Sequence, residues 1–201
     1  MPINPNAGPT NGRTVMQEAL SARVSQTRTT GSPLGGAPQT GSPLPVYDLP
    51  IGRMQDARPL DEAMLTSWRY PVIGGLHPAL VDIRESANDG LASFGGLSHG
   101  PMAARLIQAS LLAEQTLGAN PEHYEPRLLD VPALQFSALW LHGDESEHFI
   151  SLMDGHPPGT APLKMVDDIA SELRVRAATR VDGRAPLALP VVLDASATPT
   201  N

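Results

Sequence analysis

Residues 101–117 constrain the fold of this chain more than any other segment. When the segment is drawn as a helix, apolar side chains cover most of its circumference, and Arg105, Gln108 and Gln115 leave only a narrow polar strip. Pro101 suits the first position of a helix, where a backbone N–H has no partner inside the helix. Because a helix that is apolar on most sides must be covered by other elements, the sequence predicts a central, buried helix here.

Two later segments are rich in large apolar residues and are separated by a short polar loop. Residues 134–142 and 148–153 are therefore predicted to form the two strands of a hairpin. A further strand is expected over residues 79–84. Residues 187–193 are predicted to form a last strand, which Pro190 would confine to a sheet edge.

Helical patterns precede and follow these strands. Residues 162–180 are amphipathic, with acidic residues early and arginines late, as the helix dipole favours. Residues 60–68 are predicted to form a short helix that packs through Met64, Leu65 and Trp68. Each of these helices presents an apolar side that a sheet would cover.

The order of the expected elements lacks the regular βαβ alternation of a parallel sheet. The predicted fold class is α+β: a small antiparallel sheet, made of the hairpin 134–153 plus one or two further strands, packed against the central helix 101–117 and the amphipathic helix 162–180. Both faces of the first hairpin strand are apolar, so the last helix or a neighbouring molecule must cover the second face.

The first 45 residues differ in composition from the rest of the chain, because they contain 13 Pro or Gly and no aromatic residue. Such a segment cannot bury enough apolar area to offset the entropy lost on ordering. We therefore expect a disordered tail over residues 1–45, one globular domain over 46–193 and a second disordered tail over 194–201.

One part of the N-terminal tail, residues 15–24, has no Pro or Gly and places apolar residues at helical spacing. A helix this short is not stable alone in water. It would form in a groove offered by a protein partner, and the tail would then recruit that partner or be recruited by it. The side chains predicted to dock are Val15, Met16, Leu20 and Val24.

Charge and composition exclude several classes of function. The formal net charge is −7; three Arg and one Glu in the first 45 residues contribute +2, which leaves −9 for the remainder. An acidic domain repels nucleic acids and anionic membranes. The chain has no Cys, which excludes disulfides and thiolate chemistry, and no apolar run long enough to span a membrane. A cytoplasmic protein without a cofactor is the expectation.

The pattern G-x-S-x-G occurs around Ser98, just before the central helix. In α/β-hydrolases this pattern is a nucleophile elbow, and Ser98 with Asp130 and His148 would keep the order Ser, acid, His. Asp144 and His156 are alternative partners. Against this hypothesis, no buried strand precedes the motif and no repeated βα units accompany it. The alternative is a glycine-rich turn in which Ser98 caps the helix.

A second cluster surrounds the hairpin loop. His142 and His148 would approach each other across the two strands, and Asp144 or Glu147 would complete a divalent-metal site. The alternative is an ordinary solvated loop, since no fixed helical spacing of ligands supports the metal.

The Ser98 motif is explained as well by a glycine-rich turn, and the histidine cluster by a solvated loop. The N-terminal tail, in contrast, has the arrangement of a short docking peptide on a flexible linker. The sequence therefore favours a non-enzymatic protein-interaction or accessory domain, which binds a protein partner through the tail or associates with itself. The serine hydrolase at Ser98 and the metal-binding domain at residues 142–148 remain the competing hypotheses.

Overall fold

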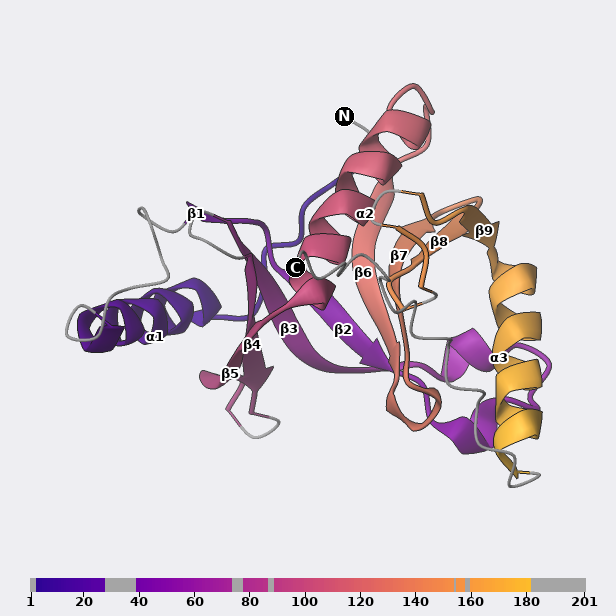
Figure 1. Cartoon of the computed structure of the whole chain (residues 1–201), viewed down its shortest axis with the longest axis horizontal. Coiled ribbons are helices and arrows are strands. Elements are labelled where there is room, and N and C mark those ends of the chain that lie inside the picture. Colours follow the sequence, from indigo (N-terminus) through magenta and orange to yellow (C-terminus); the bar gives the residue numbers. More distant parts are fainter. Residues whose placement is uncertain are drawn as a thin grey trace, which may run out of the picture.

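The computed structural model describes residues 3–27, 39–73, 78–86, 89–153, 155–157 and 160–181. This part of the chain forms three α-helices, nine strands and three short 3-10 helices (Figure 1). The α-helices are α1 (Gly12–Thr27), α2 (Pro101–Leu117) and α3 (Val166–Val181), and the 3-10 helices are η1 (Ile51–Arg53), η2 (Pro59–Glu62) and η3 (Pro132–Leu134). The strands are β1 (Gln39–Thr40), β2 (Leu44–Asp48), β3 (Met64–Ile73), β4 (Ala79–Glu85), β5 (Ala92–His99), β6 (Tyr124–Val131), β7 (Phe136–Gly143), β8 (Glu147–Ser151) and β9 (Leu163–Met165).

All nine strands belong to one open sheet, and its order is β5-β4-β3-β2-β6-β7-β8-β9, with β1 paired to β3. The named strands pair antiparallel except for β2 and β6, which meet in parallel at a seam. On each side of the seam the chain makes four strands and then a helix: a first unit, β2–β5 with α2, and a second unit, β6–β9 with α3. The predicted α+β class is confirmed, but the sheet is larger than predicted and is mixed.

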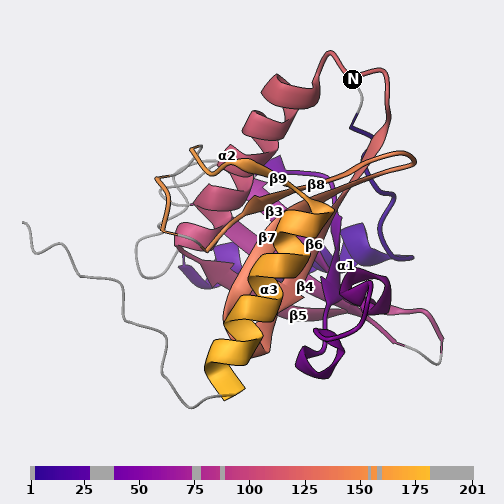
Figure 2. The ribbon, with the colours of Figure 1, turned by 90° about the vertical axis from the view of Figure 1, so that its right-hand side faces the viewer.

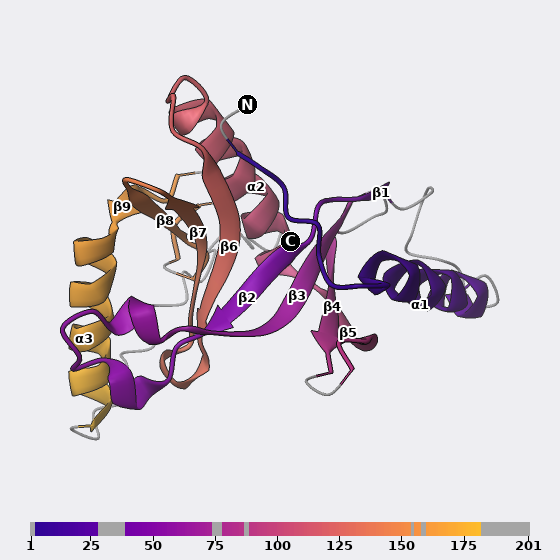
Figure 3. The ribbon, with the colours of Figure 1, turned by 180° about the vertical axis from the view of Figure 1, so that it is seen from behind.

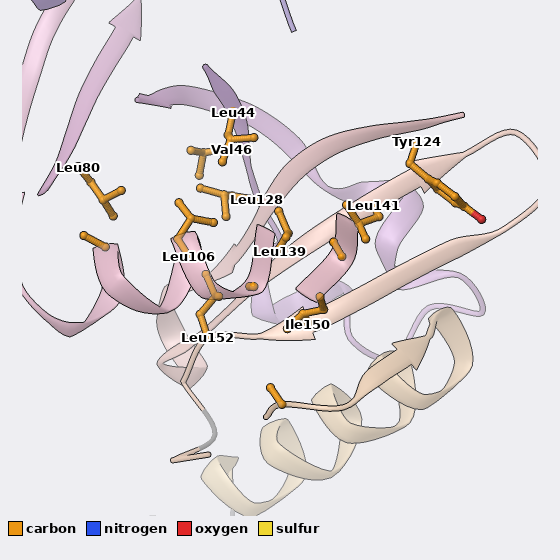
Figure 4. Close-up of a cluster of buried hydrophobic side chains, with 14 of the residues drawn as sticks. Leu44, Val46, Leu80, Leu106, Tyr124, Leu128, Leu139, Leu141, Ile150 and Leu152 are labelled. Atoms are coloured by element: carbon orange, nitrogen blue, oxygen red, sulfur yellow. The ribbon is translucent and has the colours of Figure 1, made fainter. Parts of the chain in front are cut away.

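Helix α2 spans the predicted residues 101–117 and lies across one face of the sheet (Figure 4). Its buried side chains, among them Leu106 and Ala113, pack with Leu128 of β6 and Leu139 of β7. Leu80 of β4 reaches the same cluster from the first unit. The predicted helix over 101–117 is therefore confirmed, but it is buried on one side only and not on most sides, since Leu111 is 46% exposed.

Helix α3 covers the opposite face of the second unit (Figure 2). Ile169 and Leu173 pack against Phe136 and Trp140 of β7, while Leu139 of the same strand faces α2. Successive side chains of a strand point to opposite faces, so β7 needs cover on both sides. Two helices of the same chain provide this cover.

Helix α1 packs on one face of the first unit, over β3, β4 and the edge strand β5. Met16 and Leu20 are 0% and 6% exposed and contact a cluster that includes Tyr70 and Val81. Residues 3–27 and 39–45, which the sequence assigned to a disordered tail, carry α1 and β1 in the structure, and Figure 3 shows α1 beside β4 and β5, on the side of the molecule away from α3. Residues 28–38 and the side chain of Val24 lie outside the described set.

The prediction of a helix over residues 60–68 is wrong. The 3-10 helix η2 ends at Glu62, and β3 begins at Met64. Side chains of β3 alternate, so that Tyr70 and Val72 are buried against α1 while Ile73 is exposed. Aromatic and β-branched residues fit this pleated surface better than a helix.

Sequence reasoning missed the short strands β1 and β9 and several longer strands that contain Pro or Gly. β6 carries Pro126, β2 carries Pro45, and β5 carries a pair of glycines that suggests a turn. The hairpin 134–153 and the strand at 79–84 are confirmed as β7, β8 and β4, and the helix expected from residue 162 begins at Val166, after β9.

The predicted strand 187–193 and the tail 194–201 lie outside the described residues. Among the helices that the structure describes, none combines the length and the apolar character needed to cross a membrane.

Candidate functional site

Ser98 lies in β5, where it pairs with Leu80, and its side chain is exposed. The residue at the start of α2 is Gly100, and no side chain caps the helix there. Asp130 is in β6 and His148 is in β8. At about 4.8 Å per strand, β5 is separated from β6 by roughly 19 Å along the sheet. The structure therefore does not bring Ser98, Asp130 and His148 together.

Asp130 belongs to a polar network at the seam. Arg69 donates from Nε to Asp82 (2.7 Å) and from Nη1 to Asp130 (3.2 Å). Ser137 donates to the other carboxylate oxygen of Asp130 at 2.5 Å. Burial, together with the negative charge of Asp130, raises the pKa of the neighbouring Asp48. Through this network Asp130 links the first unit to the second.

The two histidines of the hairpin point to opposite faces. His142 pairs across the strands with Glu147, so its neighbour Leu141 pairs with His148. His142 Nδ1 lies 2.6 Å from Glu147 Oε1, on the face that carries Trp140. Within the described ranges, no group of three or more His, Asp or Glu side chains has the arrangement of a metal site. The alternation of strand side chains separates His142 from His148.

His148 instead joins a network at the end of the hairpin. Its Nε2 lies 3.3 Å from Ser146 Oγ and 3.4 Å from the hydroxyl of Tyr124. Glu122 accepts hydrogen bonds from the hydroxyls of Ser146 (2.6 Å) and Tyr124 (2.8 Å) and from the backbone N–H groups of Glu145 (2.7 Å) and Ser146 (2.9 Å). The hydrogen bond from Ser146 is the largest of the causes that lower the pKa of Glu122 to about 2.

This network has a serine and a histidine but not the order of a catalytic triad. A triad needs an acid on the histidine nitrogen that faces away from the serine. The corresponding atom, His148 Nδ1, is buried and has no hydrogen-bond partner among the described residues. Glu122 binds the serine hydroxyl directly, and the arrangement fastens the β7–β8 turn to the segment before β6. Sequence reasoning missed it because Glu122 lies 24 residues from Ser146.

A cavity of about 430 Å³ opens between α2 and the sheet. Two segments outside the long strands help to line this cavity. One is the start of the chain, where the N–H of Asn4 donates to the carbonyl of Tyr124 in β6 (2.8 Å). The other is the connection from β1 to β2. We call this cavity the apolar groove; its main lining side chains are Ile3, Pro71, Ile73, Ile107, Leu111 and Leu141.

The rim of the apolar groove exposes two large apolar side chains. Ile73 of β3 and Leu111 of α2 are each 46% exposed, whereas the sequence predicted that other elements would cover most of this helix. The polar side chains of the lining are Ser42, Ser110 and Glu114. Glu114 is the charged one, and no described residue forms an ion pair with it.

A second cavity, of about 440 Å³, lies at the hairpin loop near the start of α3. Asp144, Glu145 and Glu147 line it together with Arg58 and Arg174. Arg174 bonds to backbone carbonyls of the segment between η1 and η2, and His142 bonds to Glu147. Arg174 and Glu147 thus form hydrogen bonds within the lining of this cavity and its neighbouring segments.

Comparison with protein-family models, with curated proteins and with solved structures finds no match to the chain. A functional proposal therefore rests on the geometry of its own surface.

Proposed function

We propose that this protein is a non-enzymatic binding domain whose apolar groove holds a short apolar segment of a protein partner. The observation that carries the proposal is the groove itself, a cavity of about 430 Å³ with an apolar lining and an apolar rim. This volume falls within the range of about 300–1,000 Å³ that is usual for ligand sites. No described set of side chains with catalytic geometry competes with it.

The rim gives a partner apolar area to cover. Ile73 lines the groove from β3 and Leu111 lines it from α2, and nearly half of each side chain is still exposed to water. Covering what remains would contribute roughly 1 kcal/mol for each side chain, about half of the value for complete burial. An apolar side chain inserted between them would gain a similar amount, so a segment with two or three apolar anchors fits the groove.

Charge specifies the partner further. Glu114 is the charged side chain of the lining, and the chain has a net charge of −7. Opposite charges steer association and suppress wrong partners. We therefore expect a Lys or Arg in the partner segment, next to its apolar anchors.

The recruiting role expected of residues 15–24 finds less support. Helix α1 buries Met16 and Leu20 against the sheet of its own chain. A partner would have to displace α1 before it could use these side chains, whereas the apolar groove is open as it stands.

Site-specific photo-crosslinking in the native cells tests the proposal. Benzoylphenylalanine at Leu111 is expected to capture a protein, and the crosslinked peptide should contain apolar residues beside a Lys or Arg. The same probe at Val175, which is 66% exposed on α3, is the matched control. Ile73→Asp should abolish the adduct at position 111 and leave the control unchanged. Identical adducts from positions 111 and 175 would refute the proposal.

A further inference from the structure

The two ends of the sheet differ in how they meet solvent. β9 ends the second unit and has only three residues, one of them Lys164. β5 ends the first unit and has eight residues, Ala92–His99, with no Lys, Arg, Asp, Glu or Pro. None of the eight is buried, and no strand of the described residues pairs with the outer side of β5. Proteins usually blunt such an edge by short length, charge, Pro or a β-bulge. β9 is short and charged, whereas β5 is long and uncharged and has only a bulge, at Gly95.

We propose that β5 is a homodimer interface, at which two copies of this chain pair their β5 strands antiparallel into one continuous sheet. The occupant follows from the strand itself. Residues 93–98 read Ser-Phe-Gly-Gly-Leu-Ser, nearly the same in both directions. In an antiparallel pair centred between Gly95 and Gly96, Ser93 faces Ser98 of the second copy, and Phe94 faces its Leu97.

A bulge in β5 makes this register possible. Directly opposed residues of a two-fold pair must lie on the same face of the sheet, and in a regular strand residues 94 and 97 would lie on opposite faces. Phe94 pairs with Ile83 and Leu97 pairs with Val81, and both partners belong to the cluster under α1. The register shifts between Asp82 and Ile83, which leaves Gly95 without a partner in β4. The extra residue therefore puts Phe94 and Leu97 on one face.

The two faces of the proposed pair then match in chemistry. On the α1 side, Phe94, which is 38% exposed, would pack on Leu97 of the second copy, and the reciprocal contact would form across the two-fold axis. On the other side, Ser93 and Ser98 would form two hydroxyl contacts. At the centre, Gly95 would face Gly96 of the second copy; no atom lies within 4 Å of a Cβ placed on Gly96, whereas a Cβ on Gly95 would meet Asp82 O at 3.2 Å. A symmetric pair of this kind closes on itself and needs no further copies.

Paired charge substitutions test both the dimer and its register. Ser93→Glu with Ser98→Glu would oppose like charges at both contacts, whereas Ser93→Lys with Ser98→Glu would oppose unlike charges. These side chains are exposed, so both variants should fold. Light scattering after gel filtration should give twice the 21.3 kDa chain mass for the native protein and for the Lys/Glu variant. The Glu/Glu variant should run as a monomer, with a dissociation constant at least tenfold higher.

A native protein that is monomeric at 100 µM would overturn the proposal, as would equal masses for the two variants. Disulfide trapping gives an independent test, because the chain has no Cys. A mixture of Ser93→Cys and Ser98→Cys proteins should form a crosslinked dimer under mild oxidation, and neither protein alone should do so. Equal crosslinking in all three samples would also overturn it.

Discussion

The first and second units of the sheet have the same succession of elements but different cover. In the second unit a helix lies on each face: α2 packs over Leu139 and Ile150, and α3 packs over Trp140 and Phe149. In the first unit α1 packs over Tyr70 and Val81 on one face and α2 reaches Leu80 on the other, but every residue of the edge strand β5 is at least partly exposed. Cover therefore decreases from the seam toward β5.

The difference has a simple origin in the path of α2. This helix follows β5 in the chain, yet most of the strand residues in its cluster belong to the second unit. Helix α2 reaches the first unit through Leu44, Val46 and Leu80, and α3 stays on the second unit. The second unit therefore has a helix on each face, whereas neither α2 nor α3 covers the other face of the first unit. The N-terminal helix α1 supplies the missing cover. A segment without aromatic residues, such as 1–45, can thus join the fold when a neighbouring sheet face has no other cover.

The largest expected effect is in the doubly covered unit. Leu128→Ala removes a side chain that is 0% exposed in the cluster under α2. The free energy of unfolding should fall by about 2–5 kcal/mol, since the vacated space is held open by its neighbours. Leu91→Ala, at a residue that is 49% exposed beside β5, is the control and should change it by less than about 1 kcal/mol. Urea denaturation measures both; equal losses would mean that the units do not differ in packing.

A smaller and more local effect is expected from Met16→Ala in α1. Met16 is 0% exposed, and its loss should weaken the docking of α1 by about 2 kcal/mol, the lower end for a buried Met. Hydrogen exchange should accelerate in α1, β3 and β4 and stay unchanged in β7 and β8. Gln17→Ala, at an exposed position of the same helix, is the control. Uniform acceleration over the whole sheet would show that the first unit does not open by itself.

Asp48→Asn at the seam should stabilise the protein at neutral pH. Burial is the main cause that raises the pKa of Asp48, so the folded state favours the protonated form and ionisation destabilises it. The contribution of Asp48 is therefore favourable below its ordinary pKa and is lost as pH rises through the raised value. The gain from Asn should be present at pH 7 and vanish in acid, as urea midpoints at several pH values would reveal. A gain that persisted unchanged at low pH would contradict this origin.

The smallest effect is expected from Glu122, at the far end of the second unit. Its pKa is lowered from 4.5 to about 2, chiefly by the hydroxyl of Ser146, so its stabilising contribution is present above pH 4.5 and is lost as pH falls toward 2. Glu122→Gln should remove this pH dependence. In an NMR titration, Ser146→Ala should move the Glu122 midpoint upward, toward 4.5. A midpoint that does not move would assign the low pKa to the backbone N–H groups.

Local patterns account for the elements that sequence reasoning found. The α+β class, the helix over 101–117 and the β7–β8 hairpin follow from side-chain periodicity and from the Gly and Pro residues that bound them. These features depend on neighbours within a few residues, which any single sequence displays.

The candidate sites depend on contacts between distant residues, and there sequence reasoning failed. The apolar groove needs Ile3, Pro71 and Leu111 on adjacent walls, and the network of His148 needs Glu122. The G-x-S-x-G pattern alone does not predict whether the segment forms a turn or an edge strand. Pairing with β4 made that choice for Ser98.

The sequence by itself determined where the central helix and the hairpin lie, because their periodicity and boundary residues act locally. Only the tertiary structure decided that Val46 would pair with Leu128 in parallel, that α2 would lie across both units, and that α1 would cover the other face of the first unit. Each of these outcomes is a competition among apolar faces for cover. The folded state is the one that removes the most apolar area of the whole chain from water, and no single segment of the sequence shows that total.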